Sequence, residues 1–344
     1  MSLVLEQNAN LQPLHTLAFA AQARYFARVQ NVQQLAQAYQ KAQTDKIPLY
    51  PLGHGSNLIL PEFVNAFVVQ WMPKHIRCCA QTSDYVELEV DAGCVWDDLV
   101  NFSVQKTWYG LENLAAIPGT VGAAPVQNIG AYGVEFASVV QGVQIFDAQK
   151  GELFWLEASA CEFAYRHSRF KVAAVQGGLR GHTFIVAVRI RLAKQGQLNF
   201  SYADLAQGPD APKTPAQMAA RIRAIRAAKL PDPKILPNVG SFFQNPVICR
   251  AQAQSLQAQY PQIPLYATPE PDKVKVAAAW LIETCGLKGW RQGHVGVSPQ
   301  QALVLVHYGH GRVQELLTLA GLIQQQVKQK FAIELQPEPE YWGT

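Results

Sequence analysis

Residues 110–133 read GLENLAAIPGTVGAAPVQNIGAYG, and the organisation of the whole chain is most easily understood from this stretch. Five glycines and two prolines stand in it beside a single charged residue, Glu112. The run is too interrupted for a helix interior and less polar than a surface linker. Two interpretations stay open. The stretch is either a tightly packed loop or a cradle whose backbone N–H groups meet a phosphate-bearing cofactor.

A second glycine turn, Gly53-His54-Gly55-Ser56-Asn57, lies between the apolar runs 47–52 and 58–60. Glycines with hydroxyl and amide side chains would suit a second phosphate nest, although a plain hairpin turn is the simpler interpretation. Leu58 stands where a dinucleotide-binding GxGxxG motif would have its third glycine, and no helix follows. A Rossmann fold is therefore unsupported.

Bulk composition limits the class of protein. The chain has 344 residues, 49% of them hydrophobic, which suits two or three domains, and its net charge of +4 does not argue for nucleic acid. Six cysteines without a CxxC pair and eight histidines without a metal motif predict free thiols, no metal and a cytoplasmic location. We find no signal peptide and no apolar run of about 18 residues, so no membrane contact is expected.

Hydrophobic periodicity predicts the elements before residue 229. Asn31 caps a predicted helix, and further elements are the strands 67–71, 85–90 and 184–192, the helix 95–105 and the hairpin 139–146/153–156. Thr214-Pro215 opens a helix to about residue 228. Its three arginines predict a solvated face rather than a nucleic-acid site.

Residues 229–234, KLPDPK, mark the predicted domain boundary. Beyond them we expect helices at 250–259, 276–284 and 311–330 and strands at 302–307 and 331–335. That alternation predicts a compact α+β domain.

Three further segments could carry chemistry. Residues 163–171 place cationic side chains among aromatics and could anchor an anion, or could be an amphipathic loop. Residues 238–246 hold Ser241 between a glycine and a proline, where it could donate a proton or simply cap a helix. Residues 335–343 end in Tyr341 and Trp342, so we expect this tail to pack back on the body and to bring Glu338 with it.

Together, in this order, the motifs resemble the UDP-N-acetylenolpyruvoylglucosamine reductase (UDP-N-acetylmuramate dehydrogenase) family, in its subgroup with a tyrosine-bearing substrate loop. The resemblance covers nearly the whole chain. It rests on LGHGSNLIL at 52–60, the stretch 110–133, YRHSRFK at 165–171, KLPDPK at 229–234, GSFFQNP at 240–246, VKVAAAWLIE at 274–283 and LQPE at 335–338.

The resemblance implies an α+β fold with a two-lobed FAD-binding region of the vanillyl-alcohol-oxidase (PCMH) type and a smaller α+β substrate-binding domain. We expect the FAD-binding region at 15–228, with lobes at about 15–70 and 71–228. The substrate domain would span 229–332, and the tail 333–344 would pack towards the active site. The chain would be a monomer.

The implied activity is the NADPH-dependent, FAD-containing reduction of UDP-N-acetylglucosamine enolpyruvate to UDP-N-acetylmuramate, which serves cell-wall biogenesis, cell shape and cell division. NADPH reduces the flavin, which then gives hydride to the enolpyruvyl ether. By resemblance Arg166 and Glu338 serve the enolate and carboxylate side, and Ser241 donates the proton.

The resemblance also implies which residues bind the ligands. The FAD-binding residues would be Gly53, Gly55, Ser56, Asn57, Ile117, Pro118, Gly119, Gly122, Ala123, Ala124, Asn128 and Gly130. The substrate-binding residues would be Tyr165, Tyr202, Lys229, Asn245, Tyr266, Lys275 and Gln301.

Three positions depart from the family's usual pattern. His167 stands in place of a common Asp, Gln244 in place of a frequent Lys, and Glu340 reverses a charge. Two other hypotheses remain: an FAD oxidase, which would need no Ser241 acid, and a non-catalytic flavin or nucleotide-sugar binding protein.

Overall fold

The computed structural model describes residues 2–202, 205 and 211–343. The chain folds into two compact units. The first unit contains the described residues of 1–9, 23–54 and 65–226, and the second contains 10–22, 55–64 and 227–343. The segments 10–22 and 55–64 therefore belong with the C-terminal part of the chain, which no feature of the sequence indicated. Both units mix helices and strands, so the predicted α+β class is confirmed.

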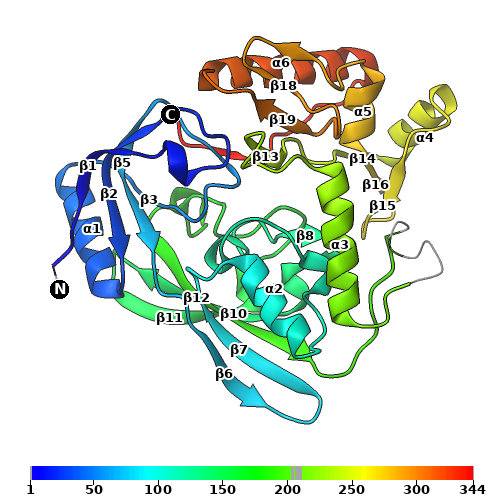
Figure 1. The fold of residues 1–344 in the computed structure, drawn as a ribbon. Coiled ribbons are helices and arrows are strands. Elements are labelled where there is room, and N and C mark those ends of the chain that lie inside the picture. Colours follow the sequence, from blue (N-terminus) through cyan, green and yellow to red (C-terminus); the bar gives the residue numbers. More distant parts are fainter. Residues whose placement is uncertain (1, 203–204, 206–210, 344) are drawn as a thin grey trace. The chain divides into compact units, whose positions relative to one another are not determined.

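The first unit is built on two main sheets (Figure 1). One has the strand order β1-β2-β5-β3 and the other β11-β10-β12-β7-β6, while β8 and β9 form a short ribbon. Their bounds are β1 Glu6–Asn10, β2 Gln22–Val29, β3 Leu49–Pro51, β5 Phe63–Trp71, β6 Ile76–Gln81, β7 Tyr85–Asp91, β8 Gly130–Ala131, β9 Val134–Glu135, β10 Val140–Asp147, β11 Glu152–Glu157 and β12 Thr183–Ala193. The helices are α1 Val32–Thr44, α2 Trp96–Gln105 and α3 Pro215–Lys229.

Each sheet of the first unit buries one face against helices. Leu35 and Ala38 of α1 pack with Val29 and Phe67 of the first sheet. The side chains of α2 and α3 share a core with β7, β10 and β12 and with the stretch 110–133. The glycine-rich stretch is therefore part of the hydrophobic core and not a surface linker.

The second unit has a four-stranded sheet, β13-β19-β18-β17, and a three-stranded sheet, β14-β16-β15. The strands are β4 Leu58–Ile59, β13 Asn238–Ser241, β14 Val247–Cys249, β15 Leu265–Ala267, β16 Lys273–Val276, β17 Arg291–Gln292, β18 Val295–Val297, β19 Val304–His307 and β20 Glu340–Tyr341. The helices are α4 Arg250–Gln259, α5 Ala278–Thr284 and α6 Val313–Phe331. Helices α5 and α6 pack their apolar sides with β18 and β19.

Most predicted elements are confirmed within a few residues. Asn31 caps α1 by accepting a hydrogen bond from the N–H of Gln34 at 3.0 Å. The predicted strand at 331–335 is wrong, because Phe331 ends α6 and the following residues are irregular. Ile333 and Leu335 are buried there against α6, and Gln324 of that helix donates to the carbonyl of Leu335. Their apolar pattern reflects packing on a helix rather than pairing in a sheet.

The arginines of α3 bind protein groups, which corrects the prediction of a solvated face. Arg223 contacts Asp97 and Asn101 of α2 at 2.8 Å, and Arg221 donates to the carbonyl of Leu205. Arg226 donates to a carbonyl of the glycine-rich stretch, and burial lowers the pKa of its guanidinium. Helical spacing alone could not show that these cations face a neighbouring loop and helix.

All six cysteines are free thiols. Within the described ranges, no helix is long and apolar enough to cross a membrane. Nor does any group of three or more His, Cys, Asp or Glu side chains in that part of the chain have a metal-binding arrangement.

Two buried histidines hold the segment 10–22 in the second unit. His307 contacts the carbonyl of Leu17 through Nδ1 at 2.9 Å and accepts the N–H of Gly311 at Nε2. It must therefore be neutral, with its proton on Nδ1. His15 contacts the carbonyl of Phe19 through Nε2 at 3.0 Å. Burial lowers the pKa of both imidazoles below the usual value.

We expect the stability of the protein to fall below about pH 6.5 because of these histidines. The unfolded chain protonates them near pH 6.5, whereas the folded chain keeps them neutral to lower pH. The free energy of unfolding should therefore decrease as pH falls through that window, by about 1.4 kcal/mol per pH unit for each histidine. Urea titrations between pH 8 and 5.5 measure this slope.

His15→Gln should flatten the slope, because one of the two groups is removed. His167→Ala is the matched control, since His167 is exposed and is not among the groups that shift the pKa of either buried imidazole. A slope that is the same in the wild type and in His15→Gln would contradict the assignment.

Candidate active site

The two glycine-rich stretches meet inside the first unit. A Cβ atom placed on Gly53 would lie 2.9 Å from Oγ1 of Thr120 and 3.8 Å from Cβ of Ala123. A side chain at position 53 would therefore meet the side chain of Thr120. The turn at 53–54 therefore lies against residues 120–123 and is not an isolated hairpin turn.

Side chains from α2 and α3 fix the start of the loop at Ala116. Asp97 accepts the N–H of Ala116 at 2.8 Å, and Arg226 donates to its carbonyl at 3.2 Å. Ala116 has a φ of +57°, a left-handed conformation that an alanine adopts only when its surroundings enforce it. Asp97 and Arg226 were not among the predicted site residues, and a charged pair on two separate helices leaves no local sequence signal.

Several backbone N–H groups of the loop remain available for an acceptor. Among the residues that the structure describes, none accepts from the N–H groups of Ile117, Gly119 or Thr120, nor from those of Gly53 or His54 opposite them. In contrast, neighbouring carbonyls are served by the protein, because the N–H of Trp96 donates to Gly119 and the Trp96 indole to Leu114. Backbone N–H groups without a protein acceptor are available to an anionic group such as a phosphate.

Gly122 and Asn128 serve the packing of the loop within the protein. A Cβ on Gly122 would lie 2.6 Å from the Cβ of Ala92, and the N–H of Gly122 donates to the carbonyl of Ala92. Gly122 thus allows close packing of the loop on the end of β7. Asn128 is fully buried and bonds to Glu135, Ala137 and Ala164, so its side chain braces the loop.

The segment 163–171 packs against the same loop. Arg166 donates from Nη2 to the carbonyl of Gly130 at 3.2 Å, and its guanidinium lies over the ring of Tyr165. Ser168 donates to the carbonyl of Val126 at 2.6 Å. Arg166 has a φ of +54°, a second strained position beside the loop. His167 is exposed, so the departure from the family pattern faces solvent.

Tyr202 is held against the end of the loop. Its ring meets that of Tyr132 edge to face with 5.2 Å between centroids. Buried Asn113 donates both to the carbonyl of Tyr132 at 2.9 Å and to the carbonyl of Asn199 at 3.0 Å. Asn113 therefore ties the segment before Tyr202 to the loop. It was missed in the sequence, where a single asparagine in an apolar run gives only a weak signal.

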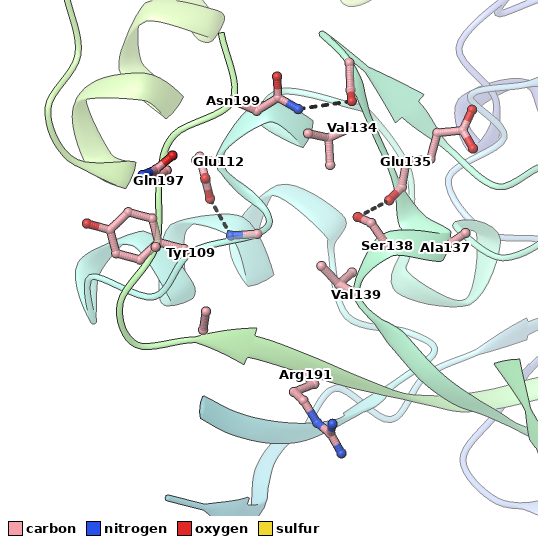
Figure 2. Close-up of a pocket in the computed structure, with 14 residues that line it drawn as sticks. Tyr109, Glu112, Val134, Glu135, Ala137, Ser138, Val139, Arg191, Gln197 and Asn199 are labelled. Carbon is pink, nitrogen blue, oxygen red and sulfur yellow. Dashed lines mark hydrogen bonds between the residues drawn. The ribbon is translucent and has the colours of Figure 1, made fainter. Parts of the chain in front are cut away.

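A pocket of about 640 Å³ opens beside the two ends of the loop (Figure 2). Its charged groups are already bonded within the protein, since Glu112 accepts the N–H of Gly110, Glu135 binds Asn128, and Arg191 pairs with Glu87. Glu112 is only 4% exposed, and burial raises the pKa of its carboxyl. None of the predicted site residues lines this pocket, so it is not the predicted cofactor site.

In the second unit, an irregularity in β13 orients Ser241. The register of β13 against β19 shifts between Asn238 and Ser241, and Gly240 between them has a φ of +74°. The side chain of Asn238 accepts the N–H of Gly240 at 2.8 Å. Phe242 and Phe243 follow as fully buried anchors, as expected. Such bulges redirect side chains next to active sites.

The tail brings Glu338 beside this strand. The N–H of Glu338 donates to the carbonyl of Phe242 at 2.8 Å, one residue from Ser241. On the other side, the amide of Asn57 donates to the carbonyl of Glu338 at 3.4 Å. Gly55 packs directly on His15, where a Cβ would lie 2.5 Å from the Cβ of that residue. Ser241, Glu338 and the turn 55–57 thus form one constellation.

The predicted substrate residues of the second unit lie on several elements. Tyr266 and Lys275 are direct partners across β15 and β16, so the strand pairing brings them together. Asn245 accepts the N–H of Ala278 at 2.9 Å, which fixes its side chain at the start of α5. Lys229 is the last residue of α3 and is exposed, and Gln301 lies in the turn before β19.

Comparison with known proteins identifies the family. Residues 232–342 match the family described as UDP-N-acetylenolpyruvoylglucosamine reductase, C-terminal domain, and residues 23–157 match an FAD binding domain. A UDP-N-acetylenolpyruvoylglucosamine reductase of Xylella fastidiosa is 39% identical over 99% of this chain and 97% of its own length. The reductase of Chromobacterium violaceum is 41% identical, over 98% and 99% of the two chains. The chain belongs to the UDP-N-acetylenolpyruvoylglucosamine reductase family.

A solved structure of the reductase from Thermus caldophilus shares the fold. It superposes with a TM-score of 0.69 over 99% of this chain and 100% of its own, at 22% sequence identity. Membership of the family makes this protein an FAD-dependent oxidoreductase with NADPH as its reductant. The FAD oxidase and the non-catalytic binding protein are thereby set aside.

We expect Gly122→Ala to disturb the loop through packing alone. The added methyl group would overlap Ala92, and overpacking of this kind costs about 1–3 kcal/mol. The free energy of unfolding, measured with urea on the FAD-free protein, should fall by that amount.

The control is Gly321→Ala in α6, where a Cβ would meet nothing within 4 Å. Alanine is the better helix former, so this variant should be at least as stable as the wild type. An FAD-free Gly122→Ala protein of wild-type stability would show that the loop tolerates the methyl group.

Proposed function

We propose that Arg166, Ser241 and Glu338 carry the reduction of UDP-N-acetylglucosamine enolpyruvate to UDP-N-acetylmuramate. The main support is the position of Glu338, whose N–H is bonded to the residue after Ser241. The reaction would serve the synthesis of peptidoglycan precursors.

We assign the FAD site to the two glycine-rich stretches. The N–H groups at Gly53, Ile117 and Gly119 would meet the pyrophosphate, as would the turn Gly55–Asn57. The remaining members of this proposed site are Pro118, Gly122, Ala123, Ala124, Asn128 and Gly130, with Asn128 and Gly122 acting through loop packing. FAD, when bound, supplies the hydride that it has received from NADPH.

The protein's own residues then manage charge and the proton. Addition of hydride to the enolpyruvyl ether spreads negative charge onto the substrate carboxylate. The guanidinium of Arg166 would stabilise that charge, with Glu338 on the same side. Oγ of Ser241 would give a proton to the carbon next to the carboxylate. The bulge at Gly240 would hold this oxygen in one direction.

The nucleotide part of the substrate would bind to the second unit. Lys229 and Lys275 are suited to a diphosphate, because ammonium groups act as compact phosphate-binding charges. Tyr266 lies opposite Lys275 and would cover the same group, and Asn245 and Gln301 would make further contacts with the substrate. Tyr165 and Tyr202 would contact substrate from the first unit. We place the enzyme in the cytoplasm as a monomer, with 229–332 as the substrate domain and 333–344 as its active-site tail.

An anaerobic colour test checks the function. The purified protein should be yellow, NADPH should bleach it, and UDP-N-acetylglucosamine enolpyruvate should restore the colour without oxygen. Recovery with oxygen alone, and none with the sugar nucleotide, would contradict the proposal.

Ser241→Ala separates the two half-reactions. Flavin reduction by NADPH should stay near the wild-type rate, while reoxidation by the sugar nucleotide should slow by about 10²–10⁴-fold, the usual contribution of a general acid. Stopped-flow absorbance measures both rates. Ser255→Ala on the exposed side of α4 is the control and should change neither. Equal slowing of both half-reactions by Ser241→Ala would count against its role as the acid.

A further inference from the structure

The backbone of the segment 336–342 bonds to two different parts of the second unit. Glu338 donates its N–H to Phe242 at 2.8 Å, and the N–H of Gln244 donates to Gln336 at 2.9 Å. After Glu338 the chain changes partner. The N–H of Glu340 donates to the carbonyl of Asn57 at 3.0 Å. Glu338 thus stands where one ladder ends and the other begins.

The second ladder ends on Trp342. Its N–H donates to the carbonyl of Ile59 at 3.1 Å, as β20 pairs in parallel with β4. The side chain of Trp342 is only 8% exposed, whereas that of the preceding Tyr341 is 44% exposed. Terminal segments are poorly ordered unless they pair with a strand or pack against the body of the protein. Trp342, which directly follows β20, is therefore the large buried side chain at this end of the described chain.

The backbone between Trp342 and Glu338 is stiff enough to transmit this anchoring. Pro337 and Pro339 stand on either side of Glu338, and each proline fixes its own φ. Pro339 also restricts Glu338 itself to extended conformations. The amide of Asn57 adds a contact to the carbonyl of Glu338 at 3.4 Å. A tail that is held at Trp342 therefore leaves the backbone of Glu338 few conformations.

We propose that Trp342 is a positioning residue for Glu338: burial of the Trp342 indole holds strand β20 on β4 and so fixes the Glu338 carboxylate for the reaction. The proposal rests on the assignment of Glu338 to the active site. Trp342 acts on the reaction through the backbone that joins it to Glu338, and loss of its side chain lets the tail from Glu338 onwards fray. The reduction of FAD by NADPH does not depend on it.

A double-mutant cycle tests this role. Trp342→Ala should slow reoxidation by the sugar nucleotide about 10- to 100-fold, the effect of misplacing a reacting group by about 1 Å, and leave flavin reduction near the wild-type rate. Added to Glu338→Gln, it should cause little further loss, because the group that it positions is already gone. Trp342→Phe should recover most of the rate. Tyr341→Ala, an aromatic truncation on the exposed side of the same strand, should match the wild type.

Amide hydrogen exchange gives a readout that is independent of turnover. In Trp342→Ala the amides of Glu338, Glu340 and Trp342 should exchange faster, while those of α6 should keep their protection. Loss of protection throughout the second unit would show general destabilisation and would overturn the proposal. If Trp342→Ala does not fold, the same exchange measurement is made on Trp342→Phe.

The outcomes also separate this inference from the proposed function. If the double variant loses reoxidation rate by the product of the two single fold-losses, the positioning role of Trp342 is overturned and the proposed function is left standing. A Glu338→Gln enzyme that reoxidises at the wild-type rate overturns the active-site role of Glu338, and with it the reason for positioning that residue.

Discussion

The need to satisfy buried backbone groups governs the stretch 110–133. Five glycines in this partly buried stretch leave peptide N–H and C=O groups without side chains to cover them. Protein donors serve the carbonyls, among them Arg226 at Ala116, Arg166 at Gly130 and Asn113 at Tyr132. The N–H groups of Ile117, Gly119 and Thr120 find no such acceptors in the described part of the chain. We propose that this one-sided arrangement suits the loop to bind an anion.

Pairing of backbone groups also determines the position of the C-terminal tail. The tail after Leu335 would be disordered in isolation, yet its peptide groups find partners on β13 and on the segment Asn57–Ile59. A turn far away in the sequence therefore supports the residue assigned to charge stabilisation. The buried His15 and His307 bond to carbonyls of the segment 10–22, which packs against Gly55 of that turn.

The sequence predicted most elements because their periodicity and caps are local signals. Asn31 before α1, Thr214 before α3 and the alternation along β12 each report the conformation of their own segment. The strand expected at 331–335 was wrong, since an apolar alternation does not say whether its partner is a sheet or a helix. The membership of 10–22 and 55–64 in the second unit has no local signal at all.

At the candidate site, too, local motifs could be predicted from the sequence and contacts between distant residues could not. The order of the motifs predicted the family and the cofactor, which the comparisons confirm, whereas the roles of Ser241, Arg166 and Glu338 stay predictions. Residues that act on the loop from elsewhere were missed, such as Asp97 and Asn113, because one contact across many residues leaves no pattern in a single sequence. The arginines of α3 were assigned to solvent for the same reason.

Hydrogen exchange at the loop amides tests the central claim most directly. It compares the FAD-free with the FAD-loaded protein, resolved to single amides at Gly53, His54, Ile117, Gly119 and Thr120. The account predicts that these N–H groups exchange much more slowly once FAD is bound, while amides already bonded within the protein, such as that of Gly122, change little. Unchanged exchange at these five positions in a protein that retains its FAD would contradict the account.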